Sequence, residues 1–154
     1  MKILLVDDDP MVRGAYAKLL LRDKHDVVIA STVAEATALA RNGIFDLCIT
    51  DIALPDASGA DLIRDLRGNP STASLPIIVL SGFAAEHQHE IIALKPHSIY
   101  QKPVAIEDLR WAIQDAGRAP SPWPHRSLPR APKNRTAFVG YGTRFFSRIP
   151  APMD

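Results

Sequence analysis

The segment Leu4-Leu5-Val6-Asp7-Asp8-Asp9-Pro10 passes from three apolar residues to three consecutive carboxylates and then to a proline. The short apolar run predicts a buried strand over Lys2–Val6. Asp9 followed by Pro10 predicts the cap and the first residue of a helix. The acidic residues therefore follow directly from the end of a strand, which is where ligands bind in open parallel sheets.

The same alternation continues through residues 1–117. Further apolar runs rich in β-branched residues predict four more strands, at Val27–Ile29, Leu47–Thr50, Ile77–Leu80 and Ile99–Tyr100. The intervening segments predict helices, which run from Pro10 to Leu20 and over Val33–Arg41, Ala60–Arg67, Ala84–Leu94 and Ile106–Ala116. Continuous apolar runs suit strands that are buried on both faces. The pattern therefore predicts an α/β fold with a doubly wound, five-stranded parallel sheet.

The composition is that of a globular protein, with 154 residues, 47% hydrophobic and 23% charged. No apolar run has the length of a membrane span or of a signal-peptide core. The single cysteine, Cys48, excludes an intrachain disulfide and a cysteine-cluster zinc site. We therefore expect a soluble cytoplasmic protein that does not contact a membrane.

The charge divides the chain into two parts. Residues 1–117 contain 11 basic and 16 acidic side chains and carry a net charge of −5, whereas residues 118–154 contain seven basic and one acidic side chain and carry +6. The second part also contains seven of the 13 prolines and five of the ten aromatic residues. The sequence thus predicts a folded acidic domain over residues 1–117 and a basic, proline-rich tail over residues 118–154.

Polar residues at the strand ends indicate the chemistry of the domain. Asp7, Asp8, Asp51, Ser81 and Lys102 follow or end four different predicted strands, so a parallel sheet brings them to one edge. Three carboxylates at close range require a cation, and an all-oxygen site favours Mg²⁺ over zinc. A lysine and a hydroxyl beside a metal-bound carboxylate suggest phosphoryl chemistry, with an aspartate as the acceptor.

These motifs resemble the receiver domain of two-component response regulators, the CheY-like family. The resemblance covers residues 1–117 and rests on the acidic segment at Asp7-Asp8-Asp9-Pro10, on Asp51-Ile52-Ala53-Leu54-Pro55 with Gly59, on Ser81-Gly82, and on Lys102-Pro103 with its usual cis peptide. It implies that Asp51 accepts a phosphoryl group from a histidine kinase or a phosphotransfer protein, and that Asp7, Asp8 and Asp51 bind Mg²⁺. It also implies that Ser81 and Lys102 contact the phosphoryl oxygens and act as the switch. The family often has an aromatic residue three positions before the lysine. Ile99 occupies that position here, so Tyr100 is the nearest candidate for the aromatic part of the switch.

The tail is too short for a second hydrophobic core, and it contains no helix-turn-helix pattern and no zinc-binding spacing. Its prolines favour an extended or disordered segment that orders when a ligand binds, with a short strand at Thr136–Val139 and a turn at Gly140–Gly142. Arginine outnumbers lysine six to one, and aromatic residues are interspersed. Arginine forks and aromatic rings together bind phosphates and stacked guanine bases, so we expect a small anionic nucleotide as the ligand.

The layout of the tail is similar to the Cle subgroup of CheY-like proteins, whose arginine-rich C-terminal segment binds cyclic di-GMP. That resemblance implies cyclic di-GMP as the ligand and docking to the flagellar motor, which would control motility and surface attachment. Asp115, near the start of the tail, could accept from a guanine edge, although an exposed helix-end aspartate is the simpler interpretation. The candidate ligand-binding residues are Arg118, Trp123, Arg126, Arg130, Arg135, Tyr141 and Arg144.

Two alternatives remain open at this stage. The protein could be a plain CheY-like shuttle, controlled by phosphorylation of Asp51, with a passive tail. The tail could instead bind RNA or DNA, although the acidic domain disfavours a long polyanion lying alongside it. In each case the output is binding, so we expect no enzymatic activity.

Overall fold

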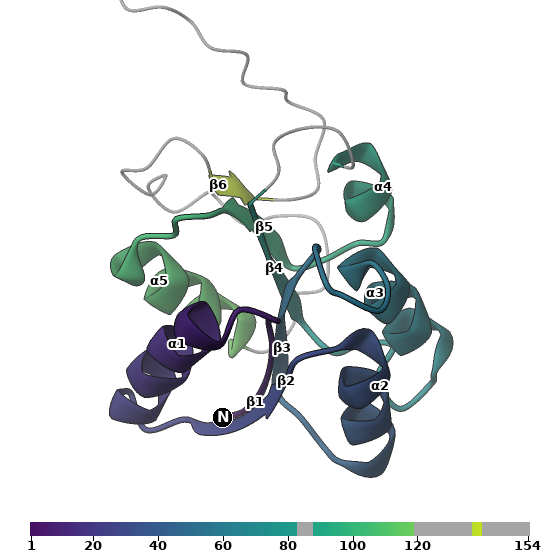
Figure 1. Cartoon of the computed structure of the whole chain (residues 1–154), viewed down its shortest axis with the longest axis horizontal. Coiled ribbons are helices and arrows are strands. Elements are labelled where there is room, and N and C mark those ends of the chain that lie inside the picture. The colour runs from purple at the N-terminus through teal and green to yellow at the C-terminus, as the bar shows by residue number, and fades with distance from the viewer. Residues whose placement is uncertain (83–87, 119–136, 140–154) are drawn as a thin grey trace, which may run out of the picture.

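The computed structural model describes residues 1–82, 88–118 and 137–139. Strands and helices alternate from the N-terminus to residue 116 (Figure 1). The elements are β1 (Lys2–Val6), α1 (Pro10–Arg22), β2 (Asp26–Ala30), α2 (Val33–Asn42), β3 (Leu47–Asp51), α3 (Gly59–Gly68), β4 (Ile77–Ser81), α4 (Gln88–Ala93), β5 (Ser98–Gln101), α5 (Ile106–Ala116) and β6 (Ala137–Val139).

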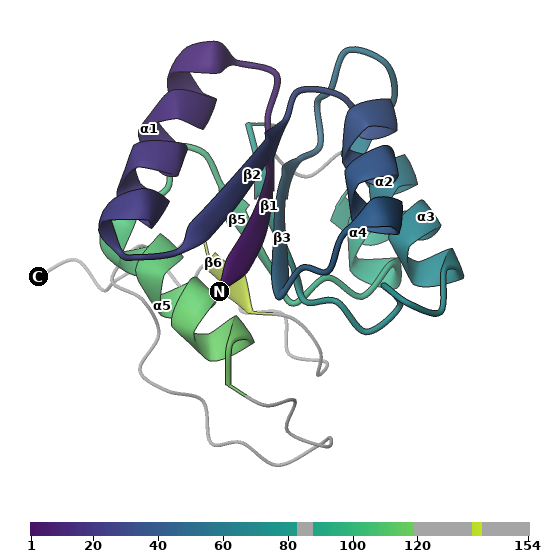
Figure 2. The same ribbon diagram turned by 90° about the horizontal axis from the view of Figure 1, so that it is seen from below.

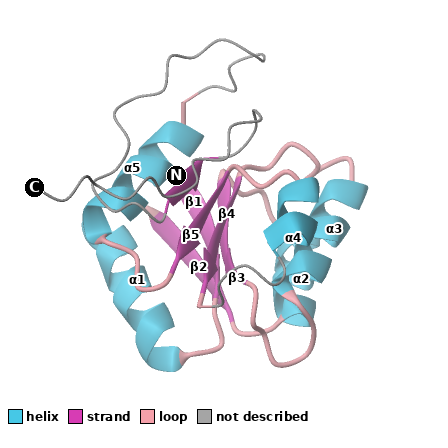
Figure 3. Cartoon of the chain, turned by 90° about the horizontal axis from the view of Figure 1, so that it is seen from above, coloured by secondary structure: helices cyan, strands magenta, loops and turns pink. Residues whose placement is uncertain are grey.

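The strands form one sheet in the order β2-β1-β3-β4-β5-β6. Strands β1 to β5 are parallel, and β6 pairs antiparallel with the outer edge of β5. Helices α1 and α5 cover one face of the sheet, and α2, α3 and α4 cover the other (Figures 2 and 3). The expected doubly wound, five-stranded parallel sheet is therefore confirmed.

Each face of the sheet packs into its own hydrophobic core. Alternate residues of one strand belong to different cores, because successive side chains of a strand point to opposite faces. Ile3 and Leu5 pack on the side of α1 and α5, whereas Leu4 and Val6 pack on the side of α2 and α3. Cys48, in the middle of β3, is fully buried in the second core, and this burial raises the pKa of its thiol to about 12.

The helix starts follow from local sequence. Asp9 caps α1, since its carboxylate accepts from the backbone N–H groups of Met11 and Val12 at 2.8 and 3.2 Å. Thr32 caps α2 by accepting from the Glu35 N–H. Ser58 and Asp61 cap α3 reciprocally, so that helix begins one residue before the predicted Ala60.

Differences from the predicted elements are confined to their ends and to β6. Four of the predicted strands are longer by one or two residues, and α4 is described from Gln88 onward because residues 83–87 lie outside the described part of the chain. The strand expected at Thr136–Val139 appears as β6, within the segment predicted to be disordered without ligand, whereas the expected turn at 140–142 lies outside the described residues. Pairing with β5 was not predicted, because the sequence pattern shows a strand but not its neighbour.

Within the described ranges, no helix is both long enough and apolar enough to cross a membrane.

Candidate functional site

The strand-end residues predicted to act together do converge. Asp7 follows β1, Asp51 ends β3, Ser81 ends β4, and Lys102 follows β5. The parallel registers align these ends, with Val6 opposite Thr50, Asp51 opposite Leu80, and Ser81 opposite Gln101. The sheet therefore presents carboxylates, a hydroxyl and an ammonium group at one edge.

Asp7, Asp8 and Asp51 form a cluster that could hold a metal ion. One oxygen from each carboxylate lies within 4.8 Å of the others, and Asp7 and Asp51 are buried whereas Asp8 is exposed. Carboxylate oxygens are the ligands that Mg²⁺ prefers, and one exposed ligand leaves the ion room for water molecules and a substrate oxygen. The donor set therefore fits Mg²⁺ and does not fit a sulfur- or imidazole-preferring metal.

Lys102 provides the positive charge nearest to this cluster among the described side chains. Its Nζ donates to Asp7 Oδ2 and to Asp51 Oδ2, both at 2.6 Å. Burial by itself lowers the pKa of Lys102, but the hydrogen bonds to Asp51 and Asp7 and the charges of both carboxylates outweigh it, so the pKa is raised. The lysine is thus held protonated between the two buried carboxylates.

The backbone fixes the orientation of Asp51. Its Oδ1 accepts from the N–H groups of Ile52 and Ala53 at 2.6 and 3.2 Å, so Oδ2 is the oxygen that faces Lys102. The chain then folds back, and the Gly59 N–H donates to the Ile52 carbonyl at 2.8 Å. A Cβ at Gly59 would lie 2.1 Å from the Asp51 carbonyl oxygen, so only glycine permits this close approach. The glycine noted in the sequence motif therefore has a steric reason.

Two residues near the site were not identified from the sequence. Arg13, on the first turns of α1, donates from Nη1 to the Asp7 carbonyl at 2.7 Å and to the Asp8 carbonyl at 3.4 Å, which steadies the acidic loop. Tyr16 lies close enough to the cluster that Lys102, Asp7 and Asp51 all affect the pKa of its phenol, which burial raises. Both residues lie within two turns of the capping residue Asp9, and this short distance along the helix is the feature of the sequence that could have placed them near the acidic cluster.

The structure treats the predicted switch residues differently. Ser81 is buried, and its carbonyl accepts from the Lys102 N–H at 2.8 Å, so it is joined to the site. The Lys102–Pro103 peptide is cis, as the resemblance implied. Tyr100 packs in the core on the side of α1 and α5, whereas Ile99 packs on the side of α2 and α3, as do Ile77 and Val79 of the strand that ends at Ser81. The structure therefore does not bring Tyr100 together with Ser81.

Most of the predicted ligand-binding tail lies outside the described residues, namely Trp123, Arg126, Arg130, Arg135, Tyr141 and Arg144. Arg118 is described and exposed, and its N–H donates to the Asp115 carbonyl at 3.2 Å. Asp115 has a partner within the domain, because its Oδ2 lies 3.2 Å from His97 Nε2. A guanine edge would have to compete with His97 for this carboxylate.

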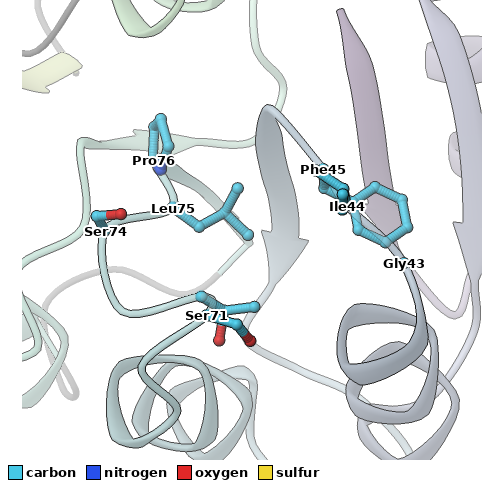
Figure 4. A pocket seen from close by; sticks show the side chains of 8 residues that line it. Gly43, Ile44, Phe45, Ser71, Ser74, Leu75 and Pro76 are labelled. Carbon is cyan, nitrogen blue, oxygen red and sulfur yellow. The ribbon is translucent and has the colours of Figure 1, made fainter.

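A separate pocket of about 200 Å³ lies at the end of the sheet opposite to the acidic cluster, where β3 and β4 begin (Figure 4). It is formed by the connections that lead into β3 and β4, and its lining residues are Gly43, Ile44, Phe45, Ser71, Thr72, Ser74, Leu75 and Pro76. None of these residues carries a charge or a strong metal ligand, so the acidic edge is the better candidate for chemistry.

Comparison with known proteins agrees with this geometry. Residues 3–114 match the family model of the response regulator receiver domain. The chain is 36% identical over 124 residues to the response regulator protein PilR of Pseudomonas aeruginosa, which covers 79% of this chain and 27% of PilR. It is 35% identical over 85 residues to a gliding motility regulatory protein of Myxococcus xanthus, covering 55% of this chain and 11% of the relative. The chain therefore matches only about a tenth to a quarter of the length of these relatives.

Solved structures show the same fold. The chemotaxis response regulator CheY4 of Vibrio cholerae superimposes with a TM-score of 0.70 at 27% sequence identity, covering 75% of this chain and 97% of that protein. The extent of the family match, together with this fold, is decisive. The chain belongs to the response regulator receiver domain family, and its acidic pocket could accept phosphate.

Proposed function

We propose that this receiver domain is phosphorylated on Asp51 by a histidine kinase or a phosphotransfer protein. The observation that carries the proposal is the placement of Asp51 Oδ2 beside Lys102 Nζ in a cluster of three carboxylates. In the transfer, this carboxylate oxygen forms a bond to phosphorus while the bond from phosphorus to the donor's imidazole nitrogen breaks. The released imidazole keeps the electron pair and takes a proton from solvent.

The residues around the acidic cluster have separate tasks in this reaction. Asp7, Asp8 and Asp51 would hold Mg²⁺, which when bound supplies charge neutralisation for the phosphoryl oxygens. Lys102 orients a phosphoryl oxygen with its ammonium group, and the buried Ser81 hydroxyl is placed on the neighbouring strand end. The backbone N–H groups of Ile52 and Ala53 hold the second Asp51 oxygen in place.

We further propose that the tail makes the protein a cyclic di-GMP effector and adaptor without enzymatic output. Six arginines and five aromatic residues in residues 118–154 support this proposal. A bidentate arginine–guanine contact contributes about 1–3 kcal/mol, and a base stacked on an aromatic ring contributes about as much. Ordering the tail opposes these gains, so several arginines must act together. Docking of the liganded protein to the flagellar motor, with control of motility and attachment, is the output that the resemblance implies.

Calorimetric titration of the full chain with cyclic di-GMP tests the ligand. We expect heat of binding from the full chain and none from residues 1–117, which contain both hydrophobic cores. The paired variant Arg126→Ala/Arg130→Ala should bind at least about tenfold more weakly, whereas Arg41→Ala, an exposed residue on α2, should bind like the wild type. No heat from the full chain would favour the plain shuttle with a passive tail. Tight, strongly salt-dependent binding of single-stranded RNA in its place would favour the nucleic-acid alternative.

Phosphorylation is tested separately with beryllofluoride and Mg²⁺, which together mimic the phosphorylated aspartate. Resonances of Ser81 and Lys102 should shift in the wild type and stay unchanged in Asp51→Asn. An equal response in both proteins would show that Asp51 is not the acceptor.

A further inference from the structure

The outer edge of β5 is occupied by a strand that does not belong to the receiver domain. The family match ends at residue 114, and β6 lies beyond it in the basic tail. β6 pairs antiparallel with β5 over three residue pairs, Ser98 with Val139, Ile99 with Phe138, and Tyr100 with Ala137. Figures 1 and 2 both show β6 beside β5 at the end of the sheet. Without β6, the N–H and C=O groups along this edge of β5 would lack strand partners.

The residues under this pairing are unusually polar for a core. Ser98 and Tyr100 are each 3% exposed, and neither hydroxyl makes a hydrogen bond of ordinary geometry among the described residues, although the Ser98 hydroxyl lies close enough to the Tyr100 phenol to lower its pKa. Burial, followed by the charges of Asp108 and Asp115 on α5, raises the pKa of Tyr100 to about 12. Of these two acids, Asp108 is itself buried, whereas Asp115 is partly exposed beside His97.

Charge makes this surface complementary to the tail. Asp115 lies against His97 at the start of β5, and Asp108 lies about two turns away on the same helix. The domain that carries these acids has a net charge of −5, and residues 118–154 have +6. Three residue pairs alone are too few to hold a free peptide, but a tether of about 20 residues keeps the strand at a millimolar effective concentration.

We propose that the edge of β5 and the adjoining end of α5 at Asp115 form a docking surface for this chain's own basic tail, with β6 as the anchoring strand. The surface accepts an extended apolar segment, β6, which adds to the sheet in the antiparallel direction, and the positive charges of the tail lie on either side of that segment in the sequence. While the tail is docked, the edge of β5 is closed to other strands. A partner that binds this part of the receiver must displace the tail first.

Hydrogen exchange of the full-length chain tests the anchoring strand. In Ala137→Pro/Phe138→Pro/Val139→Pro, β6 loses its N–H groups on both sides of the strand, so every N–H that β6 can donate to β5 is removed. We expect the outward-facing amides of Ser98–Gln101 to exchange at least about fivefold faster than in the wild type, because local opening becomes easier. The matched control Ala137→Ser/Val139→Thr keeps every N–H group and should exchange at the wild-type rate. Equal exchange in all three proteins would overturn the proposal.

The charge on α5 is tested in the same measurement. Asp115→Asn, at a partly exposed position, should also accelerate exchange of the β5 edge, by a smaller factor, and 0.5 M salt should remove the difference because it screens charges that solvent reaches. Asp65→Asn, which removes an exposed charge from α3, is the control. Exchange unchanged by Asp115→Asn would show that α5 is not part of the docking surface. These readouts use no nucleotide, so they stand or fall independently of cyclic di-GMP binding.

Discussion

Replacing Lys102 with methionine should destabilise the protein by about 3 kcal/mol at neutral pH without Mg²⁺, judging from the cost of removing one partner of a largely buried ion pair. The carboxylates of Asp7, Asp8 and Asp51 offer oxygens within 4.8 Å of one another. Two unit charges at that distance repel by about 3.5 kcal/mol at an effective dielectric constant of about 20. Lys102 offsets this repulsion through two contacts of 2.6 Å, and methionine keeps the apolar stem but not the charge. Because the lysine side chain retains 18% exposure, we place the loss at the lower end of the range for buried pairs.

Urea unfolding of the full chain at pH 7 in EDTA measures this loss. The midpoint should fall by roughly 1–3 M, since unfolding free energies of small domains change by about 1–3 kcal/mol per molar urea. Lys18→Met makes the same change of charge at an exposed position of α1, and its midpoint should stay near that of the wild type.

Two conditions should reduce the difference between Lys102→Met and the wild type. The pKa of Lys102 is raised above 10.5 in the folded state, so its stabilising contribution is complete below that pH and is lost as the pH rises through the folded value. Millimolar Mg²⁺ should stabilise the variant more than the wild type, because the ion no longer competes with the ammonium group. Equal midpoints in EDTA, or a difference that neither alkali nor Mg²⁺ reduces, would refute the assignment of Lys102 as the neutralising group.

Three further substitutions test the acidic site, an ion pair near α1 and α5, and one of the two cores. Gly59→Ala should destabilise the fold by about 1–3 kcal/mol or more in thermal unfolding, since its Cβ would lie 2.1 Å from the Asp51 carbonyl oxygen. The control Gly68→Ala should keep the wild-type stability, because a Cβ there would have nothing within 4 Å. Equal melting temperatures of the two variants would refute the steric argument. The hydrogen bond from Arg110 lowers the pKa of Asp23 below its ordinary 3.8, so the stability that the pair contributes is present above that pH and is lost as the pH falls through the folded value. Asp23→Asn should therefore lose stability at pH 6 but converge on the wild type in acid-unfolding curves, and a pH-independent difference would contradict this. Tyr100→Phe removes a buried hydroxyl that makes no hydrogen bond of ordinary geometry among the described residues. The free energy of unfolding should therefore stay the same or rise by up to about 1 kcal/mol, and a loss of about 2 kcal/mol or more would show that the hydroxyl is hydrogen-bonded in the folded protein.

The fold and the acidic site could be predicted because their signals are local. Buried parallel strands appear as apolar runs, and the carboxyl ends of those runs carry Asp7, Asp51, Ser81 and Lys102. Once the strands are parallel, the meeting of these side chains follows without further information. The cap at Asp9 was equally local, because it depends on the two residues that follow it.

Contacts across the sequence were harder to predict. The pairing of β6 with β5 joins residues about 40 positions apart, and a three-residue strand gives no signal for its neighbour. Tyr100 looked like a displaced switch aromatic, but the alternation of side chains along β5 places it in the core opposite to Ile99. Arg13 was overlooked because its partners are backbone carbonyls, which any sequence could offer.

The buried Cys48 can be used to measure how often the folded protein opens. The chain has no other cysteine, and this one is 0% exposed in the middle of β3 with its thiol pKa raised to about 12. An alkylating reagent reaches Cys48 only when the central sheet separates, because the thiol is buried and its raised pKa leaves very little of the reactive thiolate in the closed state. The labelling rate therefore reports how often the molecule opens, and any reporter thiol placed on its surface can be modified selectively with the native residue left in place.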